Sequence, residues 1–411
     1  MSVSASVTLG EVADLLVGNA FKSDGFLAEN EDGIPILRGE NVGQASLKWV
    51  GKTKRWREED LPELARYELQ LGDVILAMDR PIVGDGLKYA WITENDLPCL
   101  LVQRVCRIRG KAEKALIDYL RYVIGSPAFT EHIHRITTGA NIPHISGKDI
   151  SAFSFPLPSL AEQVKIVEAL APYDELVITY EKQIALLEEA ARLIYTEWFI
   201  RLRFPGHHQI PNNTGIPQGW KHLHFPDVAD LVGGGTPSTD RADYWDGDIL
   251  WVTPTDITRN DCLALLDTQR KITEQGLESS NARLFPPRSI LMTSRASIGY
   301  FALCDGPACT NQGFICLVPQ AEEARYFLLF NLMSRKEEIE SLATGATFKE
   351  ISKKTFQTVP LLMPSKEVLQ AFNDAVTPMI DQIFTLKRQL VVLRQARALL
   401  LPRLISGQLR L

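Results

Sequence analysis

The stretch YDELVITYEKQIALLEEAARLIYTEW, residues 173–198, returns 206 residues later as MIDQIFTLKRQLVVLRQARALLLPRL, residues 379–404. In both stretches apolar residues alternate steps of four and three positions, the heptad pattern of helices that pair along a seam. The predicted seam includes Tyr180, Ile184, Leu187, Ile194, Leu386, Leu390, Leu393 and Leu400. One residue, Arg397, interrupts it, and Pro172 and Pro378 share one repeat position, which predicts a helix start or a kink.

The repeat extends over the rest of the chain, as expected for a duplicated fold. EVADLLVG at residue 11 returns as DVADLVGG at residue 227. Three further segments return in the second half. PRSILMTSRASIG repeats GDVILAMDRPIVG and places Arg80 on Arg295, NQGFICL repeats VQRVCRI and places Gln103 on Gln312, and ATGATFKEISKKTF repeats TTGANIPHISGKDI. The chain is therefore interpreted as two copies of one unit.

Each copy is predicted to be an α+β domain followed by a long helix. Short apolar runs bounded by turn residues predict strands at 34–38, 73–78, 100–108, 249–252, 289–293 and 313–318. AEKALIDYLRYVI and its counterpart AEEARYFLLFNLM predict one core helix per copy. The predicted boundaries are 1–158 for the first domain, 159–206 for the central helical region, 207–364 for the second domain and 365–411 for the C-terminal helical region.

These features predict the fold class. Two pseudo-symmetric globular domains are joined by two long antiparallel helices that form a coiled coil, giving a dumbbell. A 26-residue seam spans about 39 Å at the helical rise, close to the roughly 34–36 Å of one turn of duplex DNA.

Composition and motifs exclude several classes of protein. The apolar fraction is 45%, the net charge is −6, and neither a secretory signal nor a membrane-spanning run is visible, so a cytoplasmic protein is expected. The six cysteines are interpreted as buried reduced thiols, and no ligand spacing supports metal binding, although His132/His134 and His222/His224 form close pairs. Phosphate-cradle, dinucleotide, nucleophile-elbow and zincin motifs are missing, so no catalytic residue is expected.

The stretch VGGGTPSTDRADYWDGDILWVTPTDI, residues 232–257, is interpreted as a recognition loop. Its hydroxyl groups and cation suit a phosphate or a base edge, and its glycines allow close approach. The residues concerned are Thr236, Ser238, Thr239 and Arg241, with Lys22 in the first-copy counterpart VGNAFKSDGF. The alternative is that Tyr244 and Trp245 are core aromatics beneath a glycine-rich turn.

This stretch, together with TGANIPHISGKDI, TGATFKEISKKTF and LPSLAEQVKIVEAL, resembles the specificity subunit of Type I restriction-modification enzymes over essentially the whole chain. The resemblance implies two target recognition domains, each reading one half of a split DNA target. It implies helices that dock two copies of a modification subunit, which methylates adenine N6 with S-adenosylmethionine, and a restriction subunit that can join. No cofactor is expected in this chain itself.

The resemblance also implies residues close to DNA where each domain passes into its helix. They are Thr138, Gly139, His144, Ser146, Lys148, Thr344, Gly345, Lys349, Ser352, Lys353 and Lys354. The next candidates are Arg80 and Arg295, which the repeat alignment treats as equivalent arginines on the loop after a strand. A lysine here is equally consistent with a solvated surface charge. The second copy departs from the first by carrying SKEVLQAF at 365–372 in place of the LAEQ segment.

Two functions from different classes remain. The first is a non-catalytic DNA specificity subunit, whose dissimilar loops AFKSDGF and GTPSTDRADYW predict an asymmetric target. The alternative is a coiled-coil scaffold whose repeated domains bind protein partners.

Overall fold

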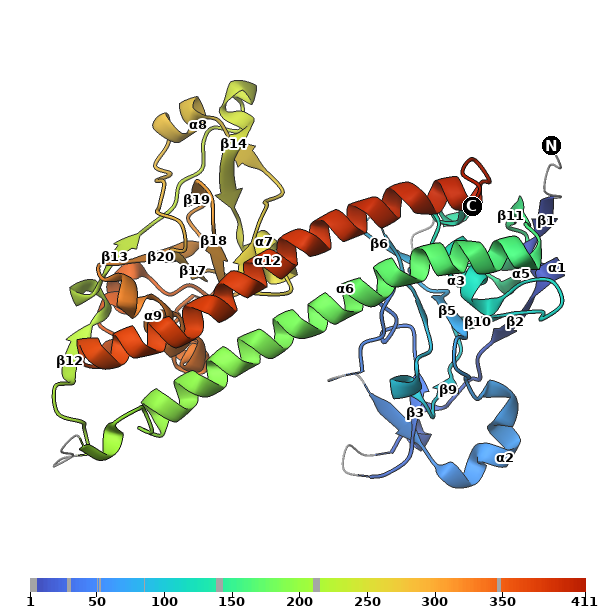
Figure 1. The fold of residues 1–411 in the computed structure, drawn as a ribbon, viewed down its shortest axis with the longest axis horizontal. Helices are drawn as coiled ribbons and strands as arrows, with labels where there is room; N and C mark the ends of the chain where they lie inside the picture. Colours follow the sequence, from blue (N-terminus) through green and yellow to red (C-terminus); the bar gives the residue numbers. More distant parts are fainter. Residues whose placement is uncertain are drawn as a thin grey trace. The chain divides into compact units, whose positions relative to one another are not determined.

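The computed structural model describes residues 6–27, 31–49, 51, 53–84, 86–137, 143–209, 215–345 and 349–411. The chain divides into two compact units. Unit 1 comprises Met1–Glu175 with Leu393–Leu411, and unit 2 comprises Leu176–Val392. Each of the two long helices contributes residues to both units (Figure 1).

Unit 1 is built on an antiparallel sheet with the order β2-β10-β5-β8. Its strands are β2 (Ala13–Val17), β10 (Val105–Gly110), β5 (Val74–Ala77) and β8 (Tyr89–Trp91). Helices α3 (Ile117–Ile124) and α4 (Pro127–Thr137) bury Tyr119, Leu120, Val123, Phe129 and Ile133 in one core with Leu76, Cys106 and Ile108. A smaller sheet joins β3 (Ile34–Leu37) to β4 (Lys54–Trp56) and β9 (Leu100–Leu101), so the predicted strand at 100–108 is two strands.

Unit 2 repeats this plan with more strands. Its main sheet has the order β13-β20-β17-β18-β15. These strands are β13 (Ala229–Val232), β20 (Phe314–Pro319), β17 (Ile290–Thr293), β18 (Phe301–Cys304) and β15 (Ala264–Leu265). Helix α9 (Arg325–Ser334) packs its apolar residues against β17 and β20. A second sheet joins β16 (Lys271–Ile272), β14 (Trp245–Val252) and β19 (Ala308–Thr310).

The two long helices are α6 (Leu160–Tyr195), which continues into a π-helical turn at Thr196–Ile200, and α12 (Lys366–Ile405). At the start of α6 the Ser159 hydroxyl accepts a hydrogen bond from the Glu162 amide, and the Glu162 carboxylate accepts one from the Ser159 amide. Pro172 therefore lies inside the helix and does not start it. The predicted fold class of two α+β domains with two long helices is confirmed.

The residues of the predicted seam lie in the cores of the two units. In unit 2, Ile184, Leu386 and Leu390 are buried in one core, against which Tyr180, Leu187 and Ile194 pack. In unit 1, Leu400 packs on the core and Leu393 is partly buried. Within unit 1 the helices run antiparallel, because Arg397 contacts Asp174 whereas the Lys165 ammonium, nine residues earlier on α6, donates to the carbonyl of Leu411.

The arginine that interrupts the heptad pattern closes a buried polar cluster in unit 1. The Arg397 Nε donates to Asp174 over 2.6 Å, and Asp174 also accepts from the Tyr122 hydroxyl at 2.8 Å. Asp174 is only 8% exposed. The corresponding residues in unit 2 are Ile380 and Ala191, both fully buried, so the same helix crossing is apolar there.

All six cysteines are buried and free, as predicted. Burial raises the pKa of the thiols of Cys99, Cys106, Cys304, Cys309 and Cys316 to about 12. Among the described residues, no helix combines the length and apolarity needed to cross a membrane.

Candidate nucleic-acid interface

Four loops of unit 1 meet at one edge of its sheet. Val17 pairs with Cys106 and Val105 pairs with Ala77, so β2 and β5 end where β10 begins. We call the segments 18–27, 78–82, 102–104 and 143–148 the loop edge of unit 1. Backbone hydrogen bonds tie them together: the Asn19 amide donates to Leu101, the Gln103 amide to Asn19 and the Arg80 amide to Pro143.

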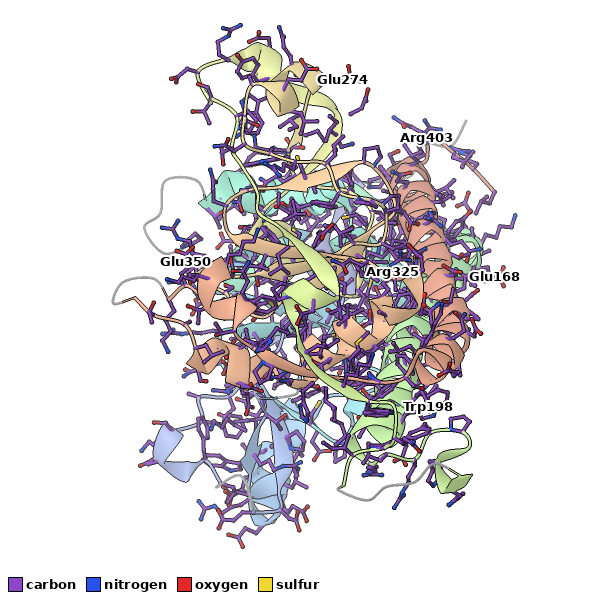
Figure 2. All side chains as sticks on the ribbon, turned by 90° about the vertical axis from the view of Figure 1, so that its left-hand side faces the viewer. Glu168, Trp198, Glu274, Arg325, Glu350 and Arg403 are labelled. Carbon is purple, nitrogen blue, oxygen red and sulfur yellow. The ribbon has the colours of Figure 1, made fainter. Side chains whose placement is uncertain are left out.

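The loop edge of unit 2 is assembled in the same way. Val232 pairs with Cys316 and Thr293 with Phe314, which brings together the segments 233–244, 294–300, 311–313 and 349–354. Figure 2 shows Glu350 on one side of unit 2 and Arg325 and Trp198 on the other, so this edge faces away from the end of α6.

Backbone hydrogen bonds define which residues of the two loop edges correspond. The Met78 amide donates to Arg104 and the Ser294 amide donates to Gly313, each over 2.8 Å. The carbonyl of Met78 accepts from Ile145, and that of Ser294 accepts from Ile351, each over 3.0 Å.

Asp79 therefore corresponds to Arg295, whereas Arg80 corresponds to Ala296. The residues Arg80 and Ala296 both have left-handed backbone, with φ of 44° and 62°, and donate to the equivalent carbonyls of Pro143 and Lys349. The alignment that placed Arg80 on Arg295 is wrong by one residue, because a match between two arginines outweighed the backbone register.

The corrected register reveals a reversal of charge between the units. In unit 1 the Asp79 carboxylate contacts His144 Nδ1 at 2.5 Å and the Arg104 guanidinium at 2.9 Å. In unit 2 the Arg295 guanidinium faces Glu350 at 3.8 Å. All these side chains are partly or largely exposed, so the two edges present different charges at equivalent positions.

The remaining basic residues implied by the resemblance lie at the start of a short helix in each unit. Lys148 is exposed on α5 (Gly147–Ser151), and Lys354 is exposed on α11 (Lys353–Gln357). Lys353 donates to the carbonyl of Leu231 at 2.5 Å. Lys349 and Thr344 precede this helix in the chain and are exposed.

The serines of the same motif have a structural role. Ser146 accepts from the Asp149 amide and Ser352 accepts from the Thr355 amide, so each serine caps its helix. The hydrogen bond from the Ser146 hydroxyl lowers the pKa of Asp149. Thr138 and Gly139 lie outside the described residues.

The glycine-rich stretch of unit 2 is partly structural. A Cβ on Gly234 would lie 2.0 Å from the Asn311 carbonyl oxygen, and one on Gly235 would lie 2.2 Å from the Ala282 amide nitrogen. Only Gly233 faces open space. Gly234 and Gly235 are therefore required by the packing of the chain on itself, and the interpretation that all three glycines allow a ligand to approach is corrected for these two.

The polar residues that follow are exposed, whereas Trp245 is buried and Tyr244 is partly buried. Thr236 donates to Gln312 at 2.7 Å, and Thr239 is exposed. The exposed Ser238 offers its carbonyl to the Trp245 indole at 3.0 Å. Trp245 is only 6% exposed, so the core alternative describes this tryptophan.

Arg241 is held in place by two neighbours. Its guanidinium donates to Asp243 at 2.7 Å and lies 5.0 Å from the centre of the Tyr244 ring. The hydrogen bond from Arg241 lowers the pKa of Asp243. Arg270 stacks on the Trp245 ring at 3.4 Å, which makes a second ordered cation in the same part of unit 2.

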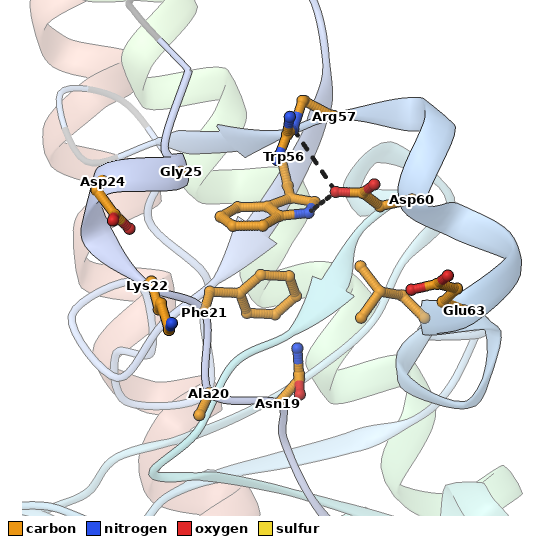
Figure 3. Close-up of a pocket in the computed structure, with 11 residues that line it drawn as sticks. Asn19, Ala20, Phe21, Lys22, Asp24, Gly25, Trp56, Arg57, Asp60 and Glu63 are labelled. Carbon is orange, nitrogen blue, oxygen red and sulfur yellow. Dashed lines mark hydrogen bonds and ion pairs between the residues drawn. The ribbon is translucent and has the colours of Figure 1, made fainter.

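The loop edge of unit 1 contains a cavity of about 460 Å³ that the motifs did not predict (Figure 3). Lys22, which was predicted, lines it together with Asn19, Ala20, Phe21, Asp24, Gly25, Trp56, Arg57, Asp60, Glu63 and Leu64. The lining comes from two segments about 30 residues apart, and only the single tryptophan among the charged residues of KRWREEDLPEL could have indicated it.

The described residues contain no group of three or more side chains arranged to hold a metal ion. His132, one of the paired histidines, instead contacts the carbonyl of Asp149 at 2.9 Å.

Comparison with known proteins gives consistent matches. The family model for the Type I restriction modification DNA specificity domain matches residues 1–189 and 217–391. The HindI specificity subunit of Haemophilus influenzae is 21% identical over 416 residues, covering 85% of this chain and 89% of that protein. The MjaIX specificity subunit of Methanocaldococcus jannaschii is 34% identical over 183 residues, covering 44% of this chain and 42% of that protein.

A solved structure shares the fold. The Type-I restriction-modification system S subunit from M. genitalium superimposes with a TM-score of 0.61 at 15% identity, covering 98% of this chain and 96% of that one.

Proposed function

The chain belongs to the Type I restriction modification DNA specificity family, and from this membership we propose that it reads an asymmetric, split DNA target, one half with each unit. The family match confirms the resemblance found in the sequence. The observation that supports the proposal is that each unit gathers four loops at one edge of its sheet in the same backbone register, yet fills equivalent positions with different side chains. Two units that recognise different DNA sequences require different side chains, which the same backbone arrangement can carry.

The side chains on these edges suit contact with DNA. Exposed lysines and arginines such as Lys148, Arg80 and Lys354 can neutralise phosphates, while Arg295 and the residues around the cavity can contact base edges. The chain is acidic overall, with a net charge of −6. We therefore expect weak, salt-sensitive DNA binding by the isolated chain and tighter binding within a complex.

The proposal includes partners. Two modification subunits dock on the chain and carry out adenine N6 methylation with S-adenosylmethionine, and a restriction subunit can join them. The chain itself supplies recognition and no catalytic step. The duplication supports two equivalent partners, because each copy of the repeat supplies one long helix.

The experiment is to co-express the chain with the modification subunit of its own system in a methylation-free host and map modified adenines by single-molecule sequencing. A split motif that changes in one half when residues 208–355 are exchanged is the expected result. A stable complex with the methyltransferase that leaves no motif would favour the scaffold function instead.

A further inference from the structure

The cavity on the loop edge of unit 1 has a rigid aromatic floor. The rings of Phe21 and Trp56 meet edge to face, with centroids 4.9 Å apart. The Trp56 indole donates to Asp60 at 2.8 Å. A Cβ on Gly25 would lie 2.3 Å from the Trp56 ring, so glycine is required for the loop to close over it. These contacts fix the floor before any ligand arrives.

The rim of the cavity is polar and is not engaged by the rest of the protein. Asn19, Lys22, Asp24 and Glu63 have no hydrogen-bond or ion-pair partner for their side chains within the described part of the chain. Figure 3 shows the Asn19 amide directed toward Phe21, with the carboxylates of Asp24 and Glu63 on opposite sides of the aromatic pair. By contrast, Asp60 is occupied by Trp56 and Arg57.

The cavity adjoins the backbone that forms the loop edge. The amide and carbonyl of Asn19 bond to Leu101 and Gln103, and Arg104, next in sequence, contacts Asp79. The cavity and the Asp79–His144 pair therefore belong to the same loop edge, which would face the duplex.

The free carboxylates and the Asn19 amide select one class of base edge, whereas the Lys22 ammonium, which only donates hydrogen bonds, suits a phosphate oxygen. Ionised carboxylates only accept hydrogen bonds, and an asparagine amide can pair with the amino group and N7 of adenine. In the major groove adenine and cytosine present an amino donor, whereas guanine and thymine present carbonyl acceptors. A carboxylate facing guanine or thymine would be left without a partner, which disfavours those bases.

We propose that the half of the target read by unit 1 presents the exocyclic amino group of an adenine or a cytosine to this cavity, where Asp24 or Glu63 accepts its hydrogen bond. Asn19 supplies the second contact when the base is adenine, and the aromatic floor contacts the apolar edge of the base. This inference rests on the proposed function, because it names the base that one reading unit recognises.

The test uses the full complex with its modification subunits. The motif of the wild-type complex is mapped first, and the half read by unit 1 is identified as the half that persists when residues 208–355 are exchanged. Binding is then measured on duplexes in which each adenine or cytosine of that half is replaced by an analogue lacking only the amino group. Asp24→Ala and Glu63→Ala are compared with Glu58→Ala, an exposed acid of the same segment that does not line the cavity.

The expected result is that the wild-type and Glu58→Ala complexes lose affinity for one analogue by about five- to a hundredfold, whereas Asp24→Ala or Glu63→Ala no longer distinguishes it from the natural base. Equal discrimination by all three variants would overturn the inference, as would a wild-type complex that ignores every analogue, while a split motif would still support the proposed function. A wild-type complex that yields no motif would overturn both.

Discussion

Arg295 in unit 2 stands at the backbone position that Asp79 occupies in unit 1. Arg295 faces Glu350, whereas Asp79 faces His144. A shared hydrogen-bond register holds both pairs at the edge of a sheet. The same backbone hydrogen bonds therefore form with an acidic residue in one unit and a basic residue in the other. Under the proposed function, a unit could change the bases it prefers without refolding.

The first prediction is that substitutions at this position act on one half of the target only. Arg295→Ala should weaken or relax reading of the half assigned to unit 2 by about 1–3 kcal/mol, because under the proposed function it removes an exposed cation available to a base or a phosphate. Asp79→Ala should affect the other half. Methylation mapping of each half measures this, with Arg201→Ala on the exposed end of the π-helical segment as the control. Equal loss in both halves from Arg295→Ala would contradict independent reading.

The second prediction concerns adjacent glycines. Gly235→Ala should destabilise unit 2 by at least about 1–3 kcal/mol, because its Cβ would overlap the backbone of residues 281–282. Gly233→Ala, in open space, should change stability by less than about 0.5 kcal/mol. Denaturant unfolding compares the two, and a similar loss from both would refute the packing role.

The third prediction tests the buried polar cluster of unit 1. Arg397→Ala should destabilise unit 1 by about 1–3 kcal/mol, because the buried Asp174 would lose its shortest ion pair and keep only Arg121, at 3.4 Å. The double variant Asp174→Ile with Arg397→Ala copies these two residues of unit 2 but leaves the Tyr122 hydroxyl and Arg121 without the Asp174 acceptor, so it should recover only part of this loss. Arg192→Ala, which removes an exposed pair with Glu189, should cost no more than about 1 kcal/mol. A double variant as unstable as the single one would show that the cluster contributes more than charge compensation.

The fourth prediction is a pH dependence. Burial raises the pKa of Glu188 above its ordinary value of 4.5. The folded state therefore binds this proton more tightly than the unfolded state, and the resulting stability is complete below pH 4.5 and lost as pH rises through the folded-state pKa. Glu188→Gln keeps an acceptor for the Leu263 amide without titrating.

The melting temperature of Glu188→Gln should match wild type near pH 4 and exceed it increasingly toward neutral pH. Glu189→Gln, an exposed neighbour, should show no such trend. A constant difference between Glu188→Gln and wild type across this range would disprove the effect.

Sequence patterns were sufficient for the features that depend on regular spacing. The helix pair follows from residues such as Ile184 and Leu390, because heptad spacing places them on one face. The duplication follows from direct repetition of sequence. The cavity could not be predicted, because Phe21 and Trp56 meet only once β3 and β4 have paired. The equivalence of Arg295 with Asp79 could not be predicted either. The register of the repeat depends on backbone hydrogen bonds, which side-chain identity does not report.

The contrast between the two helix crossings has a consequence for the history of the chain. A freshly duplicated gene would give two interchangeable halves, free to pair each with its own kind. Pairing two first copies would set Asp174 against Ala191, and pairing two second copies would set Arg397 against Ile380, so neither like pairing would form this ion pair. The two copies are therefore complementary at this crossing, and the Asp174–Arg397 pair favours association of one copy with the other over association of like copies.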